Sequence, residues 1–211
     1  MNRNIERLQG ISETAIMHSA MITAGDIAFV SQSAGSSNEK VVAQAYSTIG
    51  QIGINKPEKV RHLMDGAFTA LKDKSWEIRE QALLAIGRTG RADINTVANR
   101  VDKLIQMHCD PVPKVRGAML AACKSIAHTK AILFKPYIGL FERMLDDPDE
   151  ADVREHAPEI FAVIGKYEPE IVERSLVLLK EKLQDPSAAT RNHAVEAIRT
   201  IETFLRKTPT V

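Results

Sequence analysis

The feature that most constrains the fold is an Asp–Arg pair that returns four times at nearly constant spacing. The pairs are Asp73 with Arg79, Asp110 with Arg116, Asp147 with Arg154, and Asp185 with Arg191. Successive arginines are 37, 38 and 37 residues apart. A fixed period of this size indicates an array of supersecondary units, none of which can bury its apolar face alone. The sequence therefore predicts a repeat protein and disfavours most classes of enzyme.

The residues around each pair indicate what one unit contains. After each Arg, small or apolar residues recur three, six and seven positions later, which is one face of an α-helix. These predicted core positions are Ala82, Ala85, Ile86, Met119, Ala122, Cys123, Ala157, Ile160, Phe161, Ala194, Ala197 and Ile198. A second apolar stripe at helical spacing precedes each Asp. The predicted unit is thus a helix A, a turn that contains the Asp, and a helix B.

The repeated phrases resemble the HEAT-repeat family. The matching stretches run from Leu71 to Gly87, from Asp110 to Arg116, from Leu145 to Ala157, and from Leu183 to Ala194. The resemblance covers roughly residues 33 to 205. It implies an all-α fold, an α-α superhelix in which about five HEAT-like helical hairpins form a right-handed solenoid.

The repeat period also predicts the organisation of the chain as one repeat domain, residues 1–211. A degenerate first repeat is expected at 11–53, where Ser36 and Val42 replace the Asp and the Arg, with its helix A at 11–32 and a short polar lead at 1–9. Terminal repeats of such arrays are commonly atypical. The regular repeats are expected at 57–90, 93–128, 131–166 and 168–207.

The Asp–Arg pairs are interpreted as a structural ladder and not as catalytic groups. An Asp in the turn can accept hydrogen bonds from the N–H groups that open helix B. The Arg can pair with the Asp of its own or of the adjacent repeat. Four identical active sites in four successive units would be hard to explain, so no enzymatic activity and no catalytic residue are predicted.

No metal or cofactor site is predicted from the sequence. The six histidines and two cysteines form no H-E-x-x-H or C-x-x-C arrangement, the local spacings that direct several ligands to one metal ion. The HEAT-like di-iron hydroxylases use repeated His-Glu dipeptides, which this chain lacks.

Two prolines are expected to disturb helices of the same repeat. Pro136 lies within the third A stripe and Pro158 lies near the start of the following helix B. Because proline removes a helical hydrogen bond, each is expected to bend or restart its helix, and the superhelix is expected to change curvature there.

Composition places the chain among globular proteins, with 44% apolar and 26% charged residues. No run of 18 apolar residues is present, so no membrane span and no membrane partner are expected. The first residues lack the pattern of a secretory signal, and a cytoplasmic location is expected by default.

Function is therefore sought on a surface. In HEAT-like arrays the B helices line the concave side, so the resemblance makes the face opposite the B-helix core a candidate site for a protein or peptide partner. Its residues are Glu80, Leu84, Gly117, Ala121, Lys124, Glu155, Glu159, Lys166, Asn192, Glu196 and Arg199, with Ala43, Ser47, Gly50 and Gly87 also placed on it. The second half is acidic, with Asp149, Glu150 and Asp152 near Glu155, and this favours a basic segment of a partner. The predicted function is that of a non-enzymatic, protein-binding scaffold or adaptor.

Two alternatives stay open at this point. The HEAT-like alkylpurine DNA glycosylases bind DNA on a concave surface rich in Arg, Lys and Trp. Here the net charge is only +1 and there is one Trp, Trp76, so nucleic acid is a less favoured partner. The second alternative is that the chain is a subunit or fragment of a larger HEAT-repeat assembly. The sequence leaves its oligomeric state open.

Overall fold

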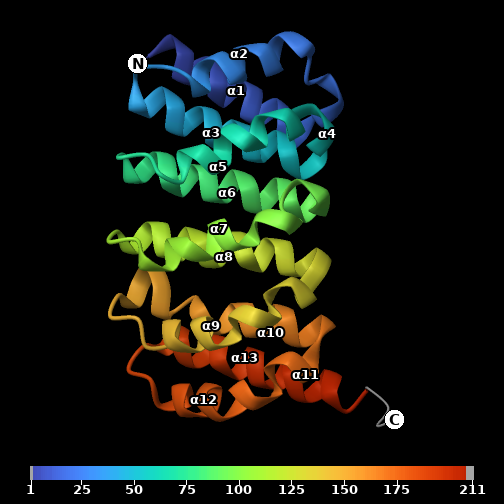
Figure 1. The fold of residues 1–211 in the computed structure, drawn as a ribbon, viewed down its shortest axis with the longest axis vertical. Coiled ribbons are helices and arrows are strands. Elements are labelled where there is room, and N and C mark those ends of the chain that lie inside the picture. Colours follow the sequence, from blue (N-terminus) through green and yellow to red (C-terminus); the bar gives the residue numbers. More distant parts are fainter. Residues whose placement is uncertain (1, 208–211) are drawn as a thin grey trace. The chain divides into compact units, whose positions relative to one another are not determined.

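The computed structural model describes residues 2–207 and divides them into two units, one up to Ser125 and one from Ile126. Every regular element among the described residues is helical (Figure 1), which confirms the predicted all-α class. No helix of this part of the chain is both long and apolar enough to cross a membrane. The prediction of one continuous repeat domain stays a prediction.

The first unit contains the helices up to the third predicted B helix, α8, whose residues from Ile126 on belong to the second unit. They are α1 (Arg3–Met17), η1 (Ser19–Met21), α2 (Ala24–Ala34), α3 (Glu39–Asn55), α4 (Pro57–Val60), η2 (Arg61–Leu63), α5 (Met64–Ala70), α6 (Trp76–Ala92), η3 (Ile94–Thr96), η4 (Ala98–Arg100), α7 (Val101–Ile105), η5 (Gln106–Cys109) and α8 (Pro113–Lys130). The predicted B helices are α3, α6 and α8. Helix α3 packs along α6.

The second unit repeats the same alternation of short and long segments. Its elements are η6 (Ala131–Tyr137), α9 (Ile138–Met144), the π-helical turn η7 (Glu150–Arg154), α10 (Ala157–Tyr167), α11 (Pro169–Val172), η8 (Glu173–Ser175), α12 (Leu176–Glu181), η9 (Lys182–Gln184) and α13 (Ala188–Leu205). The B helices are α10 and α13, which pack on each other.

The B helices bury the apolar stripe that the sequence predicted. Of the twelve predicted core residues, those from Ala82 to Ala197 are buried, while Ile198 on α13 is only partly buried. Burial of such side chains is the main contribution to the stability of each unit, at about 25 cal/mol per Å² of apolar surface.

The A segments differ from the single helix A that the sequence predicted. Each is broken into short α-helical and 3₁₀ pieces, for example α4, η2 and α5 in one repeat and α11, η8 and α12 in another. The breaks fall at Val60, Val97 and Val172, whose φ angles of −116°, −131° and −111° and ψ angles of −1°, −24° and 5° lie at the edge of the helical region. The repeat is therefore a short helix, a second short helix and a long helix B.

The N-terminal residues also depart from the prediction. Residues 1–9 were expected to be a polar lead, but α1 already begins at Arg3. It begins 36 residues before α3 and packs on it, with Leu8, Ile11 and Ala15 buried. Thr48 Oγ1 on α3 donates to the Leu8 carbonyl at 3.2 Å. Helix α1 thus takes the position of a B helix, and the predicted helix A at 11–32 is wrong because its first part belongs to α1.

The turns before the B helices share one hydrogen bond. In each, a side-chain oxygen accepts the backbone N–H two residues later: Asp73 from Ser75 at 2.8 Å, Asp110 from Val112 at 3.0 Å, Asp147 from Asp149 at 2.9 Å and Asp185 from Ser187 at 2.9 Å. Ser36 Oγ accepts from Asn38 at 3.2 Å in the degenerate repeat. The prediction that the Asp caps helix B is therefore wrong. The Asp instead shapes the turn that leads into the helix.

The arginines complete these turns. Nη1 of each Arg donates to the backbone carbonyl of the Asp in its own repeat, at 2.8 Å for Arg79, 3.0 Å for Arg116 and Arg154, and 2.6 Å for Arg191. The guanidinium of Arg79 also binds both carboxylate oxygens of Asp110 in the next repeat, at 2.7 and 2.8 Å. In the second unit Arg154 Nε lies 3.3 Å from Asp185 Oδ2.

The two prolines act as expected on their own helices. Pro136 lies inside the 3₁₀ segment η6, after which α9 begins. Pro158 lies in the first turn of α10, which begins anew after the π-helical turn η7. The expected change of superhelical curvature stays a prediction.

Glycines set the distance between neighbouring B helices at some contacts. A Cβ on Gly87 of α6 would lie 2.5 Å from the Cα of Ala122 on α8, and one on Gly50 of α3 would lie 3.0 Å from the Cα of Ala85. Both glycines are buried. The prediction that they belong to the outer face is wrong, because consecutive B helices meet along this side.

We predict that Arg79→Ala lowers the free energy of unfolding by about 1–3 kcal/mol, because it strands the buried Asp110 carboxylate without its bidentate partner. The two side chains are only 11% and 5% exposed. Arg61→Ala is the matched control, since Arg61 pairs with Asp93 at 2.5 Å but is 62% exposed. Chemical denaturation measures both. Equal effects of the two changes would contradict a structural role for the ladder.

The same pair predicts how stability depends on pH. Burial of Asp110 raises its pKa, but the hydrogen bonds from Arg79 and the Val112 N–H outweigh this and hold the pKa below the usual 3.8. The folded state therefore binds the proton less readily than the unfolded state. This contribution is complete above about pH 4 and is lost as the pH falls through the lowered pKa. Denaturation at stepwise lower pH should show a shallower decline for Asp110→Asn than for the unchanged chain.

We predict opposite effects of alanine at two glycines. Gly87→Ala should cost about 1–3 kcal/mol, because the backbone of Ala122 must move to admit the methyl group. A methyl group at Gly10 on α1 would meet no other atom within 4 Å, so Gly10→Ala should stabilise by about 0.5–1 kcal/mol. Thermal unfolding compares the two variants. Stabilisation by Gly87→Ala would show that the α6–α8 contact is not close.

Candidate functional site

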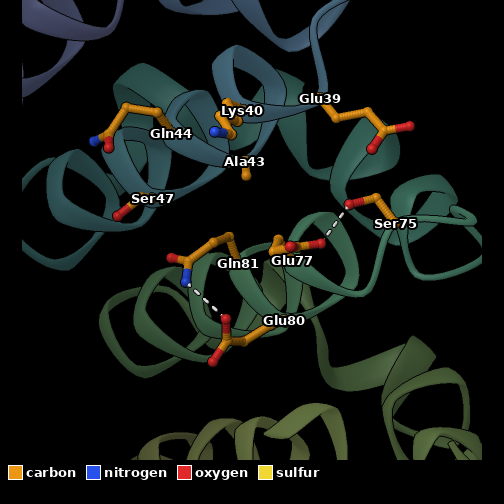
Figure 2. A pocket seen from close by; sticks show the side chains of 9 residues that line it. All are labelled: Glu39, Lys40, Ala43, Gln44, Ser47, Ser75, Glu77, Glu80 and Gln81. Atoms are coloured by element: carbon orange, nitrogen blue, oxygen red, sulfur yellow. Dashed lines mark hydrogen bonds between the residues drawn. The ribbon is translucent and has the colours of Figure 1, made fainter. Parts of the chain in front are cut away.

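The first candidate site is a pocket between two B helices of the first unit. It has a volume of about 420 Å³ and is called here the α3/α6 pocket. Its lining residues are Glu39, Lys40, Ala43, Gln44, Ser47, Ser75, Glu77, Glu80 and Gln81. Figure 2 shows Lys40, Ala43, Gln44 and Ser47 on one side and Glu77, Glu80 and Gln81 on the other. The helical period explains this arrangement, because residues three and four apart share one face.

Acidic groups predominate in the α3/α6 pocket. It holds three carboxylates, Glu39, Glu77 and Glu80, against the single ammonium of Lys40. Glu77 accepts the Ser75 hydroxyl at 2.8 Å and Glu80 accepts the Gln81 amide at 3.3 Å (Figure 2). These neutral donors orient Glu77 and Glu80, while the third carboxylate, Glu39, pairs with the exposed Lys74 ammonium at 3.4 Å. The pocket is thus prepared to bind a cation or a group rich in N–H donors.

A second pocket lies between the B helices of the second unit. This α10/α13 pocket has a volume of about 330 Å³ and is lined by Lys166, Glu196, Arg199, Thr200, Thr203 and Phe204. Arg199 Nη2 donates to Glu196 Oε2 at 2.7 Å, so these two charges bind each other. The net charge of the lining residues is weakly positive, whereas that of the α3/α6 pocket is negative.

The predicted binding face is accessible to solvent at every one of its eleven residues, none of which is fully buried. Glu80 lines the α3/α6 pocket, and Lys166, Glu196 and Arg199 line the α10/α13 pocket. Leu84 on α6 and Gly117, Ala121 and Lys124 on α8 are partly exposed, and Asn192 is exposed at the start of α13. Whether these residues bind a partner stays a prediction.

The acidic residues predicted around Glu155 do not form a cluster of free carboxylates. Glu155 accepts the Ser187 hydroxyl at 2.6 Å, and Glu150 pairs with Arg154 at 2.7 Å. Asp149 accepts the Asp152 N–H at 2.9 Å. The carboxylates of the α3/α6 pocket also have partners, but there three carboxylates line one pocket with a single ammonium, so the stronger case for a basic ligand lies in the first unit.

Glu159 has two histidines beside it. His156 Nδ1 lies 3.1 Å and His193 Nε2 lies 3.5 Å from Glu159 Oε1. The three side chains bring one ligand atom each to within 4.8 Å of one another, which is a possible set of metal ligands. The sequence reasoning missed it, because it searched for short local motifs. The available signal was that His156 and His193 are 37 residues apart, one repeat.

No protein-family model and no curated protein sequence matches the chain. Solved structures do match its fold. A designed armadillo repeat protein in complex with the peptide (KR)4 has a TM-score of 0.71 and 17% identity, with 94% of this chain and 98% of that chain covered. An engineered protein matches with a TM-score of 0.72 and 15% identity, with 96% of this chain and 98% of that chain covered.

A third match is described as computationally designed armadillo repeat proteins for modular peptide recognition, with a TM-score of 0.66, 18% identity, and 94% and 98% of the two chains covered. At these identities the likeness concerns the fold. The chain is a helical-repeat protein of the α-solenoid kind, and the HEAT type in particular is not confirmed.

Proposed function

We propose that the chain is a non-enzymatic binding scaffold that takes an extended, basic peptide segment of a protein partner against its B helices. The observation that supports the proposal is the lining of the α3/α6 pocket, which holds three carboxylates and one ammonium, with Glu39 paired outside the pocket to the exposed Lys74. Lys and Arg side chains that enter such a pocket form charge-assisted hydrogen bonds, which are about twice as strong as neutral ones.

The form of the ligand follows from the position of the pocket. It lies between two parallel B helices of consecutive repeats, so an extended peptide can place alternate side chains toward successive repeats. The small residues Ala43 and Ser47 on α3 leave room for a peptide backbone to approach. A complex of a designed armadillo repeat protein with the peptide (KR)4 supports the same chemistry for this fold.

The number of helices in the A segments distinguishes a HEAT repeat from an armadillo repeat. HEAT units contain two helices and armadillo units three. The breaks at Val60, Val97 and Val172 give three helical pieces in a repeat, counting helix B, and this supports the armadillo arrangement over the HEAT arrangement. The peptide-binding proposal does not depend on the choice, because both types expose a row of B helices.

The peptide (KR)4 is a suitable probe for the proposed function, with binding followed by fluorescence anisotropy at low and moderate salt. We predict that Glu77→Lys combined with Glu80→Lys weakens binding about tenfold or more, since 1.4 kcal/mol corresponds to a factor of ten. The salt dependence should also become weaker, because fewer ion pairs remain to be screened. Ala43→Trp should block the pocket sterically.

The matched control is Glu58→Lys combined with Glu173→Lys. Both residues are exposed on A segments, and the change in net charge is the same as in the pocket variant. A purely non-specific attraction would respond equally to both double variants. That result, or undiminished binding to the Ala43→Trp variant, would rule out the α3/α6 pocket as the peptide site.

A further inference from the structure

We propose that His156, Glu159 and His193 form a binding site for a divalent transition-metal ion of the zinc class. The three residues are called here the His–Glu–His cluster. The proposal is independent of the peptide-binding function, since the cluster lies in the second unit and its chemistry requires no peptide.

The distances within the cluster fit a metal ion. In a tetrahedral zinc site with metal–ligand bonds of about 2.0–2.1 Å, the ligand atoms lie about 3.3–3.4 Å apart. Glu159 Oε1 is 3.1 Å from His156 Nδ1 and 3.5 Å from His193 Nε2. All the ligand atoms lie within 4.8 Å of one another, so the two imidazole nitrogens need only approach each other by a modest rotation. His156 is 50% exposed and has room for this movement.

The orientation of His193 is fixed in the way that metal-binding histidines usually are. Its Nδ1 lies 2.6 Å from the backbone carbonyl of Glu155. A carbonyl only accepts hydrogen bonds, so Nδ1 carries the proton and donates it. In the neutral ring Nε2 then presents its lone pair, and Nε2 is the atom that faces Glu159. Such a hydrogen bond from the second nitrogen is the common outer support of a histidine ligand.

The backbone around His156 is irregular in a way that serves the cluster. The π-helical turn η7 ends at Arg154, and Pro158 lies in the first turn of α10. Between them the His156 N–H donates to the Val153 carbonyl at 3.0 Å, and the Glu159 N–H donates to the His156 carbonyl at 3.1 Å. Single π-helical turns are found frequently at functional sites. Here the turn presents His156 and Glu159 to His193 of α13.

The ligand atoms also indicate the kind of metal. Two imidazole nitrogens and one carboxylate oxygen suit Zn²⁺ and its neighbours Co²⁺, Ni²⁺ and Cu²⁺, whereas Ca²⁺ and Mg²⁺ prefer oxygen ligands alone. Three protein ligands leave the fourth tetrahedral position open to a water molecule or to a group from outside the chain.

The test is isothermal titration of the full chain with ZnCl₂, after treatment with a chelator and without a histidine tag. We predict uptake of about one equivalent at neutral pH and a higher melting temperature with zinc, because a ligand that binds only the folded state stabilises it. Binding should weaken in acid, because protons compete with the metal for the imidazole nitrogens. Titration with Co²⁺ should give the visible absorption of a tetrahedral ion.

Three variants and one control locate the site. His193→Ala and His156→Ala should abolish the uptake, and Glu159→Gln should weaken it about tenfold or more, as removal of a charged ligand does. His62→Ala is the control, since His62 is exposed on η2 and lies outside the cluster. Circular dichroism of each variant shows whether it is folded. If the unchanged chain takes up no zinc, or if His193→Ala binds it as tightly as His62→Ala, the proposal is wrong.

Discussion

The architecture of each unit depends on the hydrogen bonds that one arginine makes in two directions. In the first unit Arg79 donates to the carbonyl of Asp73 in its own turn and to the carboxylate of Asp110 in the next. The turn that starts one helix B is therefore held to the turn that starts the following one. The strength of this connection comes from its burial, because an exposed pair of the same geometry would be screened by water. The spacing of the repeats in the sequence is the visible result of this constraint.

Much of the fold could be predicted because this constraint requires particular side chains, an Asp and an Arg, in each repeat. The period of the Asp–Arg pairs located the long helices, and helical spacing located their core. Helix α1 was missed because it lacks the Asp–Arg pair at the repeat spacing and because its first turns are polar. The breaks in the A segments were missed for a different reason. They fall at valines that belong to stripes of helical spacing, and a valine gives no local signal that the backbone will leave the helical region.

The candidate sites show where prediction from a single helix stops. Helical periodicity placed Ala43, Ser47 and Glu80 on one surface, and these residues line the α3/α6 pocket. It placed Gly87 there as well, although this glycine faces Ala122, since only the packing of the neighbouring helix decides which side is covered. The His–Glu–His cluster requires knowledge that two helices one repeat apart are neighbours. A search within short stretches of sequence cannot find it.

The two proposed sites use the same position of the repeat. Gln44 and Gln81, which line the α3/α6 pocket, and His156 and His193 all lie two residues after the position of the repeated Arg or its replacement Val42. Stacking of consecutive B helices brings the side chains at this position close together in pairs. The position presents two amides in the first unit and two imidazoles in the second, so the residue type placed there sets the chemistry of the contact without altering the helices that carry it.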